Sequence, residues 1–149
     1  MKYLYLILFI SLTTYSQNIT THDLNLMPWP QNINLSQGVF KLTKDFTINI
    51  TGKPDARIYN YATRFLRRLD GRTGNFFTQS YIRTTNQEPN AQLQIHCKEE
   101  GKIDLNQDES YQLKITPKNI TIHANSDLGA MHALETLLQL LTAQQGQFV

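Results

Sequence analysis

The chain has 149 residues, of which 40% are hydrophobic and 17% charged, and this length suits one domain with a packed core. Its formal net charge of +2 at pH 7 is too small to indicate binding to nucleic acid or to an anionic membrane. Cys97 is the only cysteine, which excludes an intramolecular disulfide.

The first 16 residues have the pattern of a cleavable export signal. Lys2 precedes an apolar run of about ten residues, and small residues follow at Thr14 and Ser16, where a signal peptidase would cut. A membrane-spanning helix needs roughly 20 apolar residues, so a signal peptide is favoured over a membrane anchor, and no other segment is long and apolar enough to span. We expect a mature domain over residues 17–149, located in the periplasm, at the cell surface or outside the cell.

Residues 27–30 predict an extended start to the domain, because a residue that precedes proline is disfavoured in a helix. Trp29 lies between two prolines, and we interpret it as a plug that anchors the incoming chain; the alternative is an exposed platform for a sugar ring. Residues 38–43 and 46–51 then predict two strands joined by a turn at 44–45.

A helix is predicted over residues 54–70, with Pro54 in its first turn and Gly71 just past its end. Its apolar residues recur at helical spacing, and its arginines lie on the other faces, which indicates a solvated surface rather than a patch for anionic glycans. The next strand is predicted over residues 92–98, where Cys97 is expected to be a small buried side chain rather than a nucleophile.

The last third of the chain predicts a β-hairpin followed by a helix. Residues 110–116 and 120–125 alternate apolar with polar side chains, and a proline and an asparagine mark the turn between them. From residue 127 the apolar spacing becomes helical, with Ser126 or Asp127 as the cap and Gly146 beyond the end. Three polar residues of this helix are expected to face solvent: Glu135, Gln139 and Thr142.

These elements indicate an α+β fold, in which a mostly antiparallel sheet carries helices on one face. Three runs support a more specific comparison: 108–113, 120–124 and 129–141. Together with Met27-Pro-Trp-Pro-Gln31, they resemble the non-catalytic N-terminal domain of the β-N-acetylhexosaminidases of glycoside hydrolase family 20. The resemblance implies a zincin-like fold without a metal centre.

The resemblance also implies a function for the parent protein. Enzymes of this family remove terminal β-linked N-acetylglucosamine or N-acetylgalactosamine from glycans, using an adjacent Asp and Glu in a separate (β/α)₈ barrel. That barrel is absent from this chain and is expected beyond Val149. Asp108-Glu109 is an adjacent pair, but it precedes a hairpin strand in a polar loop, so we expect it to be a structural turn and the chain itself to be inactive.

No metal, cofactor or catalytic site is predicted. His132 and Glu135 are three residues apart on one helix, but zinc needs three or four ligands and the chain has no His-Glu-x-x-His pattern. His132 is expected on the polar face or at a contact with a neighbouring domain. The other histidines are scattered along the chain and suggest no site: His22, His96 and His123.

Two alternatives remain open at this point. The chain can be the N-terminal domain of another glycosidase, of the α-glucuronidase or O-GlcNAcase type, because those enzymes carry a similar domain. It can also be a stand-alone carbohydrate-binding or adhesion module, which requires aromatic side chains exposed on one surface. The candidates for that surface are Trp29, Phe76, Phe77 and Tyr81.

Overall fold

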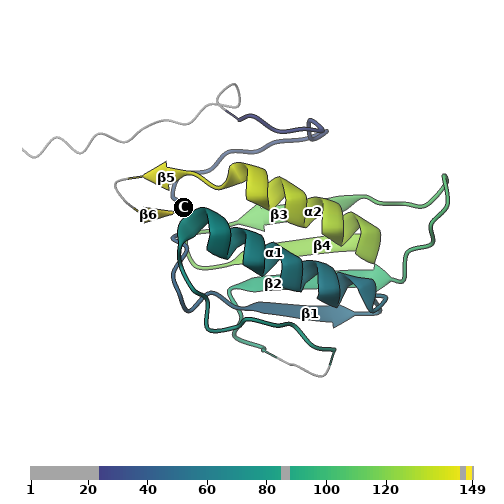
Figure 1. Cartoon of the computed structure of the whole chain (residues 1–149). Helices are drawn as coiled ribbons and strands as arrows, with labels where there is room; N and C mark the ends of the chain where they lie inside the picture. Colours follow the sequence, from purple (N-terminus) through teal and green to yellow (C-terminus); the bar gives the residue numbers. More distant parts are fainter. Residues whose placement is uncertain (1–23, 85–87, 145–146, 149) are drawn as a thin grey trace, which may run out of the picture.

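The computed structural model describes residues 24–84, 88–144 and 147–148, and its core is a four-stranded sheet with two helices on one face (Figure 1). The strands of this sheet are β1 (Ile48–Gly52), β2 (Leu93–Glu99), β3 (Tyr111–Ile115) and β4 (Ile120–Ser126). The helices are α1 (Arg57–Thr73) and α2 (Asp127–Leu140). Two short strands, β5 (Ala143–Gln144) and β6 (Gln147–Phe148), pair with each other after α2.

The strand order of the sheet is β1-β2-β4-β3. β1 pairs with β2 and β2 with β4 in parallel, whereas β3 and β4 form the antiparallel hairpin that the sequence predicts. The α+β class is therefore confirmed, but the sheet is mixed rather than mostly antiparallel. The reason is that β4 inserts between β2 and β3, and the helical crossover from β1 to β2 makes that pair parallel.

The core lies between the helices and one face of the sheet. Alternate residues of β1, β2 and β4 point to this face, because a strand alternates its side chains between two faces, and most of these residues are buried. The buried residues of β2 and β4 are Leu93, Ile95, Cys97, Ile120, Ile122 and Ala124. The burial predicted for Cys97 is confirmed.

One predicted strand is absent from the structure. Residues 38–43 form no strand, although Phe40 is buried and packs edge-on against Phe46 with ring centroids 6.0 Å apart. The turn predicted at 44–45 is present. The strand predicted over residues 38–43 was therefore wrong, and Phe40 packs on the core from a segment without strand pairing.

Helix α1 also begins and ends later than predicted. It begins at Arg57 rather than Pro54, and the Arg57 amide donates to Oδ1 of Asp55 at 2.8 Å. It ends at Gly74, whose φ of 68° is the left-handed conformation that glycine tolerates and whose amide donates to the Asp70 carbonyl. Gly71, which was predicted to lie just past the end of the helix, lies within it. The presence of a glycine was therefore not enough to locate the end of α1.

Helix α2 begins as predicted, because the hydroxyl of Ser126 accepts a hydrogen bond from the Gly129 amide at 3.3 Å. Gly146 and the proposed export signal lie outside the described residues. Among the helices that the structure describes, none combines the length and the apolar character needed to cross a bilayer.

Candidate functional site

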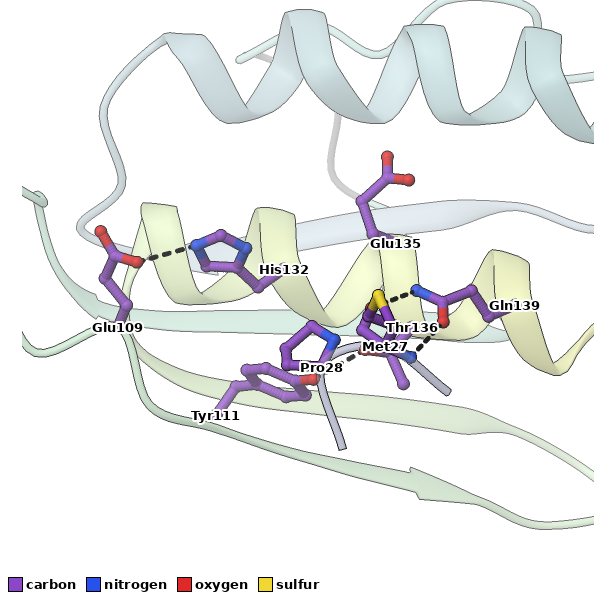
Figure 2. Close-up of a pocket in the computed structure, with 8 residues that line it drawn as sticks. All are labelled: Met27, Pro28, Glu109, Tyr111, His132, Glu135, Thr136 and Gln139. Atoms are coloured by element: carbon purple, nitrogen blue, oxygen red, sulfur yellow. Dashed lines mark hydrogen bonds and ion pairs between the residues drawn. The ribbon is translucent and has the colours of Figure 1, made fainter. Parts of the chain in front are cut away.

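A hollow of about 360 Å³ lies where the N-terminal segment passes over β3 and α2 (Figure 2). Its walls come from three separate parts of the chain, which the fold brings together. The lining residues are Met27, Pro28, Glu109, Tyr111, His132, Glu135, Thr136 and Gln139.

Gln139 holds the N-terminal segment against α2. The Met27 amide donates to Oε1 of Gln139 at 2.7 Å, and Nε2 of Gln139 donates to the Met27 carbonyl at 3.0 Å. Gln139 was expected only to face solvent, and its role as a clamp is not visible in a helical pattern. The segment itself stays open to solvent, since Trp29 is 57% exposed. Trp29 is therefore not a plug in the core, and that interpretation was wrong.

Four polar side chains of the hollow form two pairs. Nε2 of His132 lies 2.8 Å from Oε2 of Glu109, and the hydroxyls of Tyr111 and Thr136 are 2.7 Å apart (Figure 2). The pairs connect the start of the β3 region with the outer side of α2. The polar groups thus stabilise the packing of β3 on α2.

Glu135 joins the two helices, although we expected it to face only solvent. Its Oε1 accepts hydrogen bonds from the Tyr61 hydroxyl and from Arg68, both on α1. Burial raises the pKa of the Glu135 carboxyl, but the bonds from Arg68 and Tyr61 outweigh it and the net pKa lies below the ordinary value. Burial, followed by the bond to Glu135, raises the pKa of Tyr61 to about 12.

Asp108 and Glu109 point to different partners. Glu109 pairs with His132, whereas Asp108 accepts a hydrogen bond from the Ser110 amide at 2.9 Å and another from the Asn125 side chain. Hydrogen bonds from the Ser110 side chain and backbone lower the pKa of Asp108. A glycosidase general acid needs a raised pKa instead, so this arrangement suits a turn rather than a catalytic pair.

A buried ion pair anchors the start of both helices. Asp127 is fully buried, and its Oδ2 lies 2.6 Å from Nε of Arg57, in an ion pair whose angle does not meet the geometry of a hydrogen bond. Oδ1 of Asp127 also accepts from the Gly101 amide at 2.6 Å. A Cβ on Gly101 would lie 2.8 Å from this oxygen, so the position requires glycine. The sequence suggested only a helix cap for Asp127 and a solvated arginine at position 57.

The Cys97 thiol lies in the core close to this ion pair. Burial raises its pKa to about 12, with a smaller contribution from the Asp127 charge. The thiol is therefore protonated at neutral pH and unsuited to act as a nucleophile.

Two histidines that looked unrelated in the sequence are neighbours in the sheet. His96 of β2 lies in register with His123 of β4, and their ring centroids are 5.9 Å apart. His22 lies outside the described residues. Among residues 24–84, 88–144 and 147–148, no three histidine, cysteine, aspartate or glutamate side chains gather closely enough to hold a metal ion.

The aromatic residues do not gather on one surface. Phe77 is buried in the core at 7% exposure, so it is no candidate for stacking on a sugar. Trp29 follows the residue pair Met27-Pro28 in the chain, and the Met27 amide donates to Gln139 of α2. Phe76 and Tyr81 flank Gln79, which bonds to Ile48 of β1, at the opposite edge of the sheet. This distribution argues against a stand-alone sugar-binding module.

Comparison with known proteins finds one family domain that covers most of the chain. Residues 23–149 match the family model described as glycosyl hydrolase family 20, domain 2. A chitobiase of Flavobacterium johnsoniae is 56% identical over 88% of this chain, with a TM-score of 0.85.

Two more distant structures share the fold. They are an exo-β-N-acetylglucosaminidase of Vibrio harveyi (23% identity over 83% of this chain and 17% of that one, TM-score 0.56) and a β-N-acetylhexosaminidase of Bacteroides fragilis (21% over 83% of this chain and 22% of that one, TM-score 0.54). The chain spans only 20% of the Flavobacterium johnsoniae chitobiase. No curated protein matched the chain.

Proposed function

The chain belongs to glycosyl hydrolase family 20, and from this we propose that it is the supporting, non-catalytic domain of an exported β-N-acetylhexosaminidase. The observation that carries the proposal is the similarity to the chitobiase, which extends over most of this chain but only a fifth of that enzyme. The parent enzyme would remove terminal β-linked N-acetylglucosamine or N-acetylgalactosamine from glycans. The similarity of this chain to a chitobiase favours this activity over that of an α-glucuronidase or an O-GlcNAcase.

The site geometry supports a non-catalytic role for this domain. Asp108 has a lowered pKa, and Glu109 is paired with His132, so neither is arranged as the acid of a glycosidase. The catalytic Asp and Glu would instead come from a (β/α)₈ barrel in the same polypeptide.

The outer side of α2 is the surface proposed to contact that barrel. Met27 is 82% exposed beside the hollow, where Gln139 holds its backbone, so an apolar side chain is presented in a fixed position. Apolar groups that are exposed on an ordered surface favour burial against another surface. The partner is the barrel that the family carries in the same chain.

The test is an assay with a chromogenic N-acetylglucosaminide. We expect no turnover by residues 17–149, and turnover by the product of the reading frame extended past Val149, which should encode roughly 250 or more residues of barrel with an adjacent Asp and Glu. Export would appear as a mature N-terminus at Gln17 in the periplasm or medium. Turnover by residues 17–149 alone, or an extended product without a barrel, would overturn the proposal.

A further inference from the structure

We propose that His96 and His123 form a binding site for a divalent transition-metal ion, with Cu²⁺ bound most tightly, on the face of the sheet opposite the helices. The proposal does not depend on the hexosaminidase assignment, because it rests on the register of β2 and β4. It would give this domain a ligand of its own.

The register places the two imidazoles side by side. His96 lies directly opposite His123 across the parallel pair of β2 and β4. The residues that alternate with them point to the core, so both histidines point to the outer face, and both are exposed. Both helices cover the other face of the sheet (Figure 1), so neither helix covers the two imidazoles.

The separation of the rings suits one shared ion. A metal bound 2.0–2.1 Å from a ring nitrogen lies about 3.2 Å from the ring centroid, so two rings on one ion have centroids at most about 6.4 Å apart. The centroids of His96 and His123 are 5.9 Å apart. Small rotations of two exposed side chains can therefore bring both rings onto one ion.

The hydrogen bonds around His96 allow the tautomer that a metal needs. The Thr51 hydroxyl lies 3.2 Å from the Ile95 carbonyl, which can only accept. When the hydroxyl donates its single proton there, its contact with Nδ1 of His96, also at 3.2 Å, is one in which the imidazole donates. The proton on Nδ1 leaves the lone pair of Nε2 free. A metal-binding histidine usually has a second hydrogen bond of this kind, which orients the ring.

The surroundings indicate an open site with two protein ligands. Lys98 and Lys114 share this face of the sheet with the histidines. Among the described residues, no third histidine, cysteine, aspartate or glutamate joins the pair, so water would fill the remaining positions of a bound ion. Two imidazoles with open positions suit Cu²⁺, which binds nitrogen ligands more tightly than the other divalent ions of its row.

The experiment is titration of the full chain with Cu²⁺. Calorimetry measures the affinity and the number of bound ions, and electron paramagnetic resonance reports the ligands of the copper. We expect one bound ion with a signal from two nitrogen ligands. His96→Ala and His123→Ala should each weaken binding at least about tenfold and remove that signal, and Thr51→Val should weaken it by about tenfold, because the second hydrogen bond is lost. His132→Ala is the matched control, since His132 is an exposed histidine on α2, and this variant should bind as the wild type does.

The result that overturns the proposal is equal affinity and an equal signal in the wild type and the His96 and His123 variants. Loss of binding in His132→Ala with binding kept in the other two would overturn it as well. Far-ultraviolet circular dichroism establishes that each variant is folded, and His96→Gln and His123→Gln replace any alanine variant that is not.

Discussion

At the scale of single residues, the strongest constraint is the charge buried at the start of α2. Asp127 has no exposed surface, and Arg57 is the cation that pairs with it. An isolated carboxylate in this position would be costly, because few water molecules could solvate it. The ion pair thus links the first turns of the two helices.

We expect Arg57→Met to lower the free energy of unfolding by about 3 kcal/mol, because it leaves the Asp127 charge buried without its partner. Urea unfolding at pH 7 measures this loss. Arg67→Met is the control, since Arg67 is an exposed arginine of the same helix, and it should change the free energy by less than about 0.5 kcal/mol. Equal stability of the two variants would show that the ion pair is not important.

Predictability at this scale depended on sequence distance. The cap at Ser126 and the burial of Cys97 followed from local pattern and were found. The partners of Asp127 and Glu135 were missed, because Arg57 and Tyr61 are about 70 residues away and no periodicity connects them. The one signal in the sequence was a charged residue on an apolar helix, such as Asp127, because a buried charge requires a partner.

At the scale of the elements, the packing of α1 against α2 depends on ionisation. Glu135 must be charged to hold both Tyr61 and Arg68 fully, and its pKa is lowered in the folded state. A carboxyl with a lowered folded pKa contributes stability above its unfolded pKa of about 4.3, and this contribution is lost as the pH falls through the folded value.

We therefore expect Glu135→Gln to lower the free energy of unfolding by about 1 kcal/mol at pH 7. This difference from the wild type should shrink once the pH falls below about 4. Chemical unfolding at pH 7 and at pH 3 measures it. Glu99→Gln, at the exposed end of β2, is the matched variant and should show little difference at either pH. A cost for Glu135→Gln that is the same at both pH values would contradict the role of the charge.

The elements themselves were largely predictable, and their order was not. Strict alternation identified β3 and β4, and a proline and an asparagine identified the turn between them. The parallel pairing of β2 with β4 has no local signal, because the hairpin alone fits several positions in a sheet. The neighbouring positions of His96 and His123 were missed for the same reason.

At the scale of the whole molecule, the proposal of a supporting domain predicts that its carboxylates do not take part in the chemistry. In the proposed full-length enzyme we expect Glu109→Gln to leave kcat for a chromogenic N-acetylglucosaminide within about threefold of the wild type. Loss of a true general acid would cost about 100-fold or more. Steady-state kinetics on the purified enzyme measures this, and a loss of that size in a folded variant would assign the chemistry to Glu109.

The central place of β4 also sets the order in which the domain can be built. Until residues 120–126 have left the ribosome, β2 can pair with β1 but not with β4. Helix α2, which packs on β2, is not yet synthesised either. Completion of the sheet then waits for nearly the whole domain to be synthesised, and long-range pairing of this kind is slow. A chain secreted as we propose would gain from that delay, because the translocation machinery would receive it before it had become compact.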